Sequence, residues 1–455
     1  MLHFKLSTSK LSNFSTLYTL HSTLIIACAL LTSCSPVSLQ TTVEGGAIEG
    51  VQLTEQVKAY LGIPYAAAPV GDLRWQAPQP VQPWSGVLAT QAFANDPMQI
   101  FRYSDMVFRG PAFSEDCLYL NVWTSAKRTT DKQPVLIYFN GGGWIGGSAS
   151  EYRYDGAAMA ATGVITVTAN YREDIFGFFA HPELSAETDY HGSGNYGLMD
   201  QAAAIEWVKN NIAAFGGDPN RITIAGESAG SFSVSLLMIS PLAKDHIAGA
   251  ILSSGAHVHP ALATPLTQAE QQGQELTQGK SLAQLRAMSA DELVQAYALS
   301  SMPQVVVDGY VLTAAPDSLY INKEQAQVPL LAGWNSLEGY PLDSSSFGLF
   351  IADITRNLCT YQFEANQPVY RYRFCRSRDP QLKGAVHSSE IEYAMGNLST
   401  NKVYDWQPAD YELSNRFLHY YSNFCKTGNP NGEGLPTWEP LSSTDEPVLQ
   451  LDILY

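Results

Sequence analysis

Ser228 stands at the centre of the glycine-flanked sequence GESAG (226–230), which has the form Gly-x-Ser-x-Gly. A serine hydroxyl becomes a useful nucleophile only when a base lies within hydrogen-bond reach and donors await the oxyanion. Glycines two residues away on either side permit the tight strand-to-helix turn that exposes such a serine. Because a three-position pattern recurs by chance in long chains, a structural serine in a tight bend is the alternative.

A second glycine-rich sequence, NGGGWIGG (140–147), follows an apolar run and could supply the oxyanion donors. Consecutive glycines let backbone N–H groups face a developing negative charge without obstruction by side chains. We expect the N–H groups of Gly142 and Gly143, together with that of Ala229, to form an oxyanion hole. A phosphate-binding loop is the alternative, but the sequence lacks both the Gly-Lys-Ser/Thr ending and the G-x-G-x-x-G spacing.

The base and its orienting acid are expected after Ser228, in the chain order Ser, acid, His. His387 lies in KGAVHSSEIEYAMG (383–396), where flanking Gly and Ser predict a loop, the usual place for a triad histidine. His419 lies in a helical pattern, which is typical of a packing histidine. For the acid, Glu338 comes just past an apolar run and before a glycine; Asp308 is the rival, although it could simply close a turn.

The elements that would position these residues alternate along the chain. Residues 194–216 have apolar side chains at helical spacing and end at Gly216, which predicts a helix. A glycine-punctuated hairpin is expected at 46–50 and a Pro-rich surface segment at 58–75. Strands alternating with helices predict an α/β fold, with a central mostly parallel sheet flanked by helices. Apolar and β-branched runs predict its strands at 134–144, 163–172, 221–226, 248–255, 328–334 and 368–374.

The composition limits the class of protein. The chain has 455 residues, of which 45% are apolar and 15% charged, and this describes a globular protein. A net charge of −17 without any basic run argues against nucleic acid as a partner, since phosphate binding depends on clustered Lys and Arg. No Cys-x-x-Cys or Cys/His cluster is present, so we expect no metal site, and no motif requires a cofactor.

The first 33 residues are typical of a secretory signal peptide, because Lys5 and Lys10 precede an apolar core (24–31) too short to span a bilayer. The sequence LTSC (31–34) resembles a bacterial lipobox, in which the leader is cut before Cys34 and that cysteine is acylated. We expect a lipoprotein-type signal peptide over 1–33, a tether over 34–43 and one folded domain over 44–455. The chain is then exported and attached to a membrane of the cell envelope; the alternative is an ordinary cleavage site and a soluble periplasmic or secreted protein.

Taken together, the motifs resemble those of the type-B carboxylesterase family of α/β-hydrolases, which includes bacterial para-nitrobenzyl esterases, animal carboxylesterases and cholinesterases. The resemblance runs from about residue 44 to the end. It is carried by YLGIPYAAAPVGDLRW (60–75), SEDCLYLNVW (114–123), NGGGW (140–144), NYREDIFGF (170–178), the long block 194–231, GAVHSSEIEYAMG (384–396) and FCKTGNPNG (424–432).

The resemblance implies an α/β-hydrolase fold with Ser228 as nucleophile, Glu338 as triad acid and His387 as base. It also implies Gly142, Gly143 and Ala229 as the oxyanion hole, and it implies no cofactor. Ser228 would attack an ester carbonyl to form an acyl-enzyme. Glu227 is expected to be a buried structural or electrostatic acid outside the triad, with its side chain directed away from that of Ser228.

Several positions depart from the family pattern. Asn140 stands where many relatives have His, and Cys117 lacks its usual disulfide partner, so it is expected to be unpaired. A Cys359–Cys375 bridge is a further possibility, which spacing alone does not fix. Glu338 and His387 are only 49 positions apart (387 − 338), whereas relatives have a longer helical excursion there. This shortened helical region predicts a more open, wetter site and a broader substrate range.

The substrate class follows from these features. In choline-hydrolysing relatives a tryptophan precedes the EDC sequence, but residues 97–114 here contain none, which disfavours choline esters. We expect a small neutral or aromatic carboxylic ester, with Trp144 and Phe178 either lining the pocket or packing in the core. The alternatives are a non-catalytic binding or adhesion module on the same fold, and an amide or carbamate hydrolase with the same triad.

Overall fold

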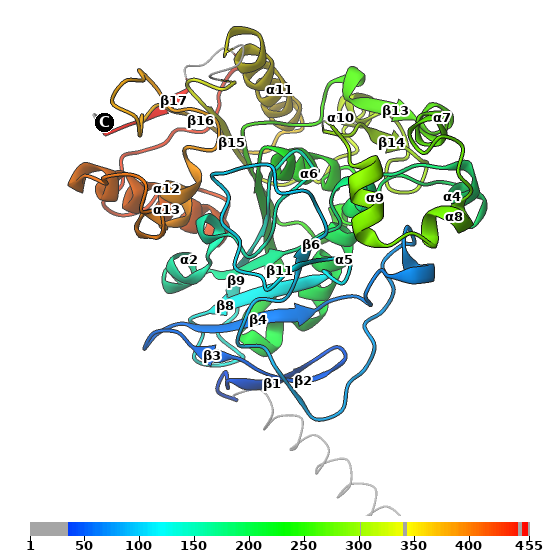
Figure 1. Cartoon of the computed structure of the whole chain (residues 1–455). Helices are drawn as coiled ribbons and strands as arrows, with labels where there is room; N and C mark the ends of the chain where they lie inside the picture. The colour runs from blue at the N-terminus through cyan, green and yellow to red at the C-terminus, as the bar shows by residue number, and fades with distance from the viewer. Residues whose placement is uncertain (1–34, 301, 340–343, 445–447, 454–455) are drawn as a thin grey trace, which may run out of the picture.

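The computed structural model of the chain describes residues 35–300, 302–339, 344–444 and 448–453 (Figure 1). The predicted signal peptide and the predicted lipid attachment site, Cys34, lie outside these residues. Within the described ranges, no helix combines the length and the apolar character needed to cross a membrane.

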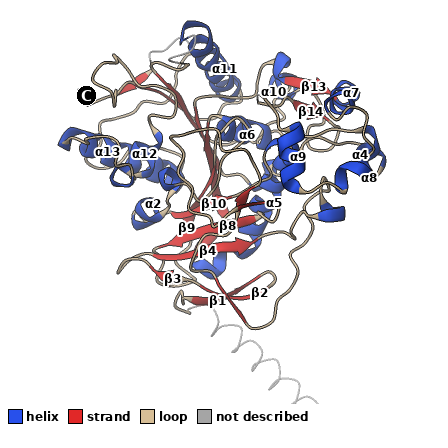
Figure 2. Ribbon diagram, in the orientation of Figure 1, coloured by secondary structure: helices blue, strands red, loops and turns tan. Residues whose placement is uncertain are grey.

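A ten-stranded sheet forms the centre of the molecule, with helices on either side of it (Figures 1 and 2). Seven neighbouring strands, from β17 to β10, are parallel, and β8, β4 and β3 extend the sheet in antiparallel pairs. The prediction of a mostly parallel α/β sheet is therefore confirmed. In spatial order the strands are β17 (Leu449–Leu451), β16 (Val369–Phe374), β15 (Leu330–Asn335), β12 (Gly249–Ser253), β11 (Gly217–Glu227), β9 (Gln133–Phe139), β10 (Ile165–Ala169), β8 (Tyr119–Thr124), β4 (Lys58–Pro64) and β3 (Val51–Gln52).

Helices cover both faces because successive side chains of each strand point to opposite sides. In β9, Val135 and Ile137 join an apolar cluster with α5, α6 and α11, whereas Leu136 and Tyr138 join a second cluster with α12 and α13. Both faces of the parallel strands are thus buried, as their near-continuous apolar runs require. The helices are α2 (Ala157–Ala161), α3 (Asp174–Gly177), α4 (Pro182–Ala186), α5 (Tyr196–Asn211), α6 (Ala229–Leu237), α7 (Leu266–Leu276), α8 (Leu282–Arg286), α9 (Ala290–Tyr297), α10 (Pro316–Ile321), α11 (Ser344–Glu364), α12 (Ile391–Met395) and α13 (Pro408–Thr427).

Three small sheets lie outside the main one. In the first, residues predicted as a hairpin at 46–50 are instead one strand, β2 (Gly46–Glu49), which pairs with β1 (Gln40–Val43) across a turn at 44–45 and with β5 (Val87–Ala89) on its other side. The others pair β6 (Asp96–Pro97) with β7 (Phe113–Ser114) and β13 (Ala263–Pro265) with β14 (Val305–Val307).

The start of the predicted Pro-rich surface segment is instead a strand of the main sheet. Residues 58–64 form β4, which pairs with β8 and whose side chains at Ala59, Tyr60 and Ile63 are fully buried. The surface prediction was wrong here because Pro64 lies at the end of the strand and Gly62 at an irregularity in its pairing, where each breaks few ladder hydrogen bonds.

All four cysteines in the described residues are free thiols. The expectation that Cys117 is unpaired is confirmed, and the possibility of a Cys359–Cys375 bridge was wrong. Cys359 is fully buried within α11 in the cluster shared with α5 and α6. Cys375 follows β16 and is half-buried, with its Sγ 3.6 Å from the Arg373 carbonyl oxygen.

Candidate active site

Ser228 occupies a sharp turn between β11 and α6. Its backbone has φ 55° and ψ −124°, a strained combination for a residue that carries a Cβ, and its side chain is partly exposed. The following glycine is required by close packing, since a Cβ added at Gly230 would lie 2.2 Å from the Phe139 carbonyl oxygen. The Gly-x-Ser-x-Gly sequence therefore folds as the strand–turn–helix that such a motif needs.

The glycine-rich loop after β9 lies directly beside this turn. Strands β9 and β11 are parallel neighbours, with Phe139 paired to Gly226, so the segments that leave them emerge side by side. A Cβ added at Gly141 would lie 3.1 Å from the Cβ of Ser228. Gly142 has φ +116°, and a Cβ there would lie 1.7 Å from the Gly146 carbonyl oxygen, so only glycine fits.

This packing leaves backbone donors available next to Ser228. In the described part of the chain, neither the Gly142 nor the Gly143 N–H donates to a protein acceptor. The Ala229 N–H belongs to the first turn of α6, where no intrahelical acceptor exists. The positive end of the helix dipole also favours negative charge at this position. Gly142 and Gly143 directly follow Gly141, which packs against the Ser228 side chain, and Ala229 follows Ser228 in the chain, so all three donors belong to the segments beside this serine.

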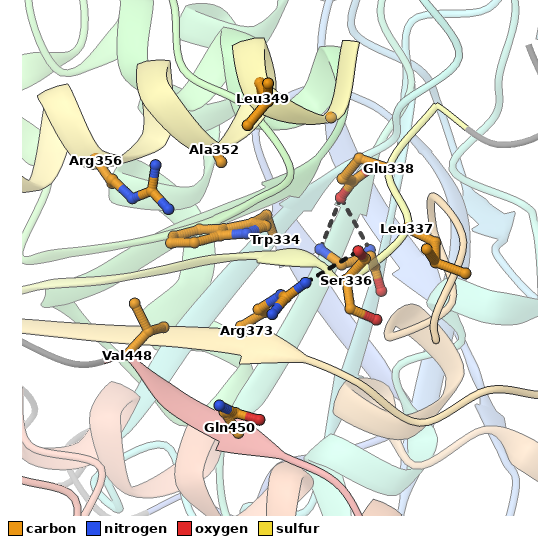
Figure 3. A pocket seen from close by; sticks show the side chains of 12 residues that line it. Trp334, Ser336, Leu337, Glu338, Leu349, Ala352, Arg356, Arg373, Val448 and Gln450 are labelled. Carbon is orange, nitrogen blue, oxygen red and sulfur yellow. Dashed lines mark hydrogen bonds between the residues drawn. The ribbon is translucent and has the colours of Figure 1, made fainter. Parts of the chain in front are cut away.

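Glu338 and His387 form a close pair. Glu338 follows β15, and its Oε2 lies 2.5 Å from Nδ1 of His387. Its other oxygen, Oε1, accepts hydrogen bonds from the backbone N–H of Asn335 at 2.8 Å and from the Asn335 amide at 3.3 Å (Figure 3). The Glu338 side chain is 1% exposed and that of His387 is 30% exposed, so the imidazole is partly open to solvent while the carboxylate is covered.

Backbone contacts join the loop that carries Glu338 to the loop that carries His387. The Leu337 N–H donates to the Ala385 carbonyl oxygen at 2.7 Å, and Leu337 forms an isolated parallel bridge with Val386. The loop after β15 and the loop carrying His387 are therefore fastened to each other at the residues adjoining Glu338 and His387.

Two further buried carboxyl groups surround His387. Oε1 of Glu227 lies 3.2 Å from His387 Nε2 and accepts a hydrogen bond from the Ser388 hydroxyl at 2.7 Å. Glu390 accepts from the Ser254 hydroxyl at 3.2 Å and from the Asn335 amide at 2.5 Å. Sequence reasoning placed Glu227 near the serine but did not connect it to His387, and it missed Glu390 altogether. The only available indication was that Glu390 follows His387 by three positions in one motif.

The carboxyl groups shift the protonation of the histidine. Burial alone would lower the pKa of His387, but the charges of Glu227 and Glu338 outweigh it and raise that pKa to about 10. Burial would raise the pKa of Glu338, yet the charge and hydrogen bond of His387 lower it below its ordinary value. Burial dominates for the other two acids and raises the pKa of Glu227 and, to about 8, that of Glu390. The cluster therefore favours a protonated imidazole next to an ionised Glu338.

The rival residues have other partners. Oδ1 of Asp308 accepts the backbone N–H groups of Tyr310, Val311 and Leu312, so this carboxylate closes a turn. His419 lies within α13, with Nδ1 2.7 Å from the Asn415 carbonyl oxygen one turn earlier. Neither arrangement presents the group to Ser228.

The remaining predicted residues hold the glycine-rich loop in place and do not line the site. The Asn140 amide donates to Oε1 of Glu173 at 2.9 Å, which ties the start of the glycine-rich loop to the segment after β10. Trp144 is fully buried, stacks on Phe178 with ring centroids 5.1 Å apart and donates from Nε1 to the Ser233 hydroxyl at 2.8 Å. Trp144 and Phe178 are therefore core side chains that hold the loop in place.

Known proteins share this sequence and architecture. The sequence model of the carboxylesterase family matches residues 36–347 and 342–453. Fumonisin B1 esterase of Sphingopyxis macrogoltabida is 36% identical over 417 residues, covering 79% of this chain and 75% of that protein. Cocaine esterase of Homo sapiens is 30% identical over 524 residues, covering 94% of this chain and 91% of that protein.

Two solved structures superpose on most of the chain. A PNB esterase aligns with a TM-score of 0.80 at 28% identity, covering 91% of this chain and 96% of that one. A carboxylesterase of Geobacillus stearothermophilus aligns with a TM-score of 0.78 at 30% identity and the same coverage.

Proposed function

Because this chain belongs to the carboxylesterase family, has its α/β-hydrolase fold and is a serine ester hydrolase, we propose that Ser228, His387 and Glu338 are its catalytic triad. The observation that carries the proposal is the 2.5 Å contact between Glu338 Oε2 and His387 Nδ1. The loops that carry these two residues are joined to each other, and Ser228 stands on its strained turn at the end of β11 in the same sheet.

The proposed reaction runs through an acyl-enzyme. Ser228 attacks the ester carbonyl while His387 takes its proton, and the N–H groups of Gly142, Gly143 and Ala229 stabilise the oxyanion. His387 then gives the proton to the leaving alcohol. In the second half, His387 activates a water molecule that releases the acid and frees Ser228. Glu338 holds the imidazole in the required tautomer and stabilises its charged form.

The proposed substrates are small neutral or aromatic carboxylic esters. The absence of tryptophan from residues 97–114 disfavours a choline ester. The relatives named as esterases of fumonisin B1 and of cocaine support an ester rather than an amide or carbamate. The test is turnover of para-nitrophenyl acetate and butyrate by the purified chain, with covalent labelling by an organophosphate probe. Turnover with a single adduct on Ser228 is expected. The absence of both turnover and labelling would overturn the proposal.

Replacing Glu227 with Gln is expected to shift the pH dependence of kcat/KM. His387 acts as base only when neutral, so activity rises as pH increases through its pKa, which the surrounding carboxylates hold above 6.5. Removing the Glu227 charge lowers that pKa, and the acidic limb of the profile therefore moves to lower pH. The profile is measured beside Glu206→Gln, an exposed carboxylate on α5. An unmoved limb, or one displaced to higher pH, would contradict the role of Glu227.

We also propose that residues 1–33 are a lipoprotein-type signal peptide, that Cys34 carries a lipid and that residues 34–43 tether one folded domain (44–455) to a membrane of the cell envelope. The apolar core at 24–31 and the LTSC sequence support this proposal. Cys34→Ser is expected to move the protein from the membrane fraction to the soluble fraction. A wild-type protein that is already soluble would contradict it and favour a periplasmic or secreted form.

A further inference from the structure

Asn140, the residue from which the glycine-rich loop starts, is held by the segment that follows β10. Its Nδ2 donates to Oε1 of Glu173 at 2.9 Å, and its backbone carbonyl oxygen accepts from the Tyr171 hydroxyl at 2.8 Å. Gly142 and Gly143, the proposed oxyanion donors, follow Asn140 by two and three positions. The position of those donors therefore depends on how firmly Glu173 and Tyr171 hold Asn140.

Glu173 and Asn140 are both enclosed by protein. Glu173 is fully buried and Asn140 is 1% exposed. The space beside Glu173, which Arg74 and Arg172 also line, has no room for a water molecule. An ionised Glu173 would therefore receive no hydration, and burying a charge in this way is costly unless a cation pairs with it.

No cation compensates Glu173. The two arginines that line the same space already have acidic partners. Arg74 lies 2.6 Å from the Glu115 carboxylate, and Arg172 lies 2.7 Å from that of Asp200. Within the described ranges, Glu173 takes part in no ion pair. Its carboxyl group is thus a buried acid without a counter-charge.

The other titratable groups around Glu173 supply no positive charge either. Asp174, the next residue, is a second acid. The phenol of Tyr171 and the thiol of Cys117 are neutral, because burial raises the pKa of each. Burial also raises the pKa of Glu173 to about 8, and the hydrogen bond from Asn140 offsets this only in part. Glu173 is therefore protonated at neutral pH.

A proton on Glu173 supplies a donor that its pair with Asn140 lacks. In the part of the chain that the structure describes, Oε2 of Glu173 and Oδ1 of Asn140 have no hydrogen-bond partner. Both atoms are acceptors when the carboxyl group is ionised. A protonated carboxyl group can donate its O–H to an amide oxygen while its carbonyl oxygen accepts the amide N–H. Ionisation would leave both acceptors buried without a donor.

The charge of Glu173 also acts on a group beside the oxyanion donors. A Cβ added at Gly143 would lie 3.3 Å from the Tyr103 hydroxyl. Burial raises the pKa of Tyr103, Arg102 opposes the rise, and the negative charge of Glu173 adds to it. A carboxylate close enough to influence Tyr103 would equally disfavour a negative charge on a substrate oxygen held at Gly143.

We propose that Glu173 is a positioning residue that works as a neutral acid. In its protonated form it holds Asn140 and keeps the N–H groups of Gly142 and Gly143 directed at the oxyanion, and its ionisation weakens the oxyanion hole. The inference rests on the proposed function and adds an alkaline limit to the activity. Neutral His387 and neutral Glu173 are then both required, so deprotonation favours activity at the first residue and opposes it at the second.

Glu173→Gln tests this proposal, because glutamine keeps the size of the side chain and can donate to Asn140 but cannot ionise. The measurement is the ratio of variant to wild-type kcat/KM for para-nitrophenyl butyrate between about pH 6 and about pH 9.5, with spontaneous hydrolysis subtracted. Both proteins contain His387, so its titration cancels in the ratio. The ratio is expected to stay near one at the acidic end and to rise about tenfold at the alkaline end, less than the loss of a whole oxyanion donor would give.

A second variant and a matched control complete the design. Glu173→Leu removes the hydrogen bond to Asn140 and should lower kcat about tenfold at every pH with little change in KM, because oxyanion donors act in the transition state. The control is Asp308→Asn. Asp308 is another buried acid whose pKa is raised by burial, but its carboxylate bonds to Asn195 and to its own turn. Its ratio to wild type should not change with pH.

The outcomes separate this inference from the proposed function. A Glu173→Gln ratio that stays constant over the whole pH range would overturn the inference. So would a loss of activity in Glu173→Gln at every pH, because the ionised acid would then be the working form. In both cases wild-type enzyme still hydrolyses the ester and is labelled by the organophosphate probe. If it does neither, the proposed function itself fails.

Discussion

Replacing Ser228 with alanine is expected to reduce kcat for para-nitrophenyl butyrate by about 10⁴- to 10⁶-fold. The variant removes the oxygen that would form the acyl-enzyme, while the backbone donors of Gly142, Gly143 and Ala229 remain. Those donors leave a residual acceleration over water, so a small hydrolysis rate should persist. The measurement is single-substrate kinetics at high enzyme concentration, combined with mass spectrometry of the organophosphate-treated protein, in which the adduct should be lost.

Ser233→Ala is the matched control for this variant. Ser233 is fully buried in α6, one turn beyond the strained position, and accepts hydrogen bonds from Trp144 and Gln201. Its loss should cost about 1–3 kcal/mol of stability, because two buried donors lose their acceptor, but it should leave the nucleophile in place. Ser228→Ala protein that retains more than about one hundredth of wild-type kcat would contradict the assignment of the nucleophile.

Replacing Glu338 with glutamine is expected to reduce kcat by about 10⁴-fold. The amide keeps the size of the side chain, but it cannot stabilise the imidazolium that forms as Ser228 attacks. Through its NH₂ group it also favours the wrong tautomer of His387. Because Glu338 is almost completely buried and receives two hydrogen bonds from Asn335, thermal unfolding should be recorded beside the kinetics.

Asp308→Asn provides the comparison, since Asp308 was the other candidate acid. Its carboxylate closes a turn through three backbone N–H groups and also accepts from the Asn195 amide at 2.9 Å. This variant is expected to lower the melting temperature while kcat stays within about threefold of wild type. A loss of kcat in Asp308→Asn that exceeds the loss in Glu338→Gln would reverse the assignment of the acid.

The sequence was most informative where the determining forces are local. The β-branched run before GESAG and the helical spacing of 194–216 gave β11 and α5, because strand and helix periodicity follow from neighbouring residues. Glycine identified the tight turns, since only glycine fits where a Cβ at position 230 would lie 2.2 Å from another backbone segment. The failure at 58–64 has the same origin, because prolines and glycines describe the backbone but not which strand it pairs with.

Tertiary structure alone decided how the carboxyl groups are arranged around His387. Glu227, Glu338 and Glu390 come from the ends of different elements, and only the order of β11, β12, β15 and β16 in the sheet brings them to one imidazole. Residues 99–110 likewise lie beside Gly142 and Gly143, held by hydrogen bonds from Gln99 to Gly147 and from Arg109 to Ser150 that no local pattern encodes. The sequence by itself determined which residues could do chemistry and on which turns they stand. Their mutual distances, and hence the direction of each pKa shift, depend on long-range strand pairing and burial, which local residue patterns do not specify.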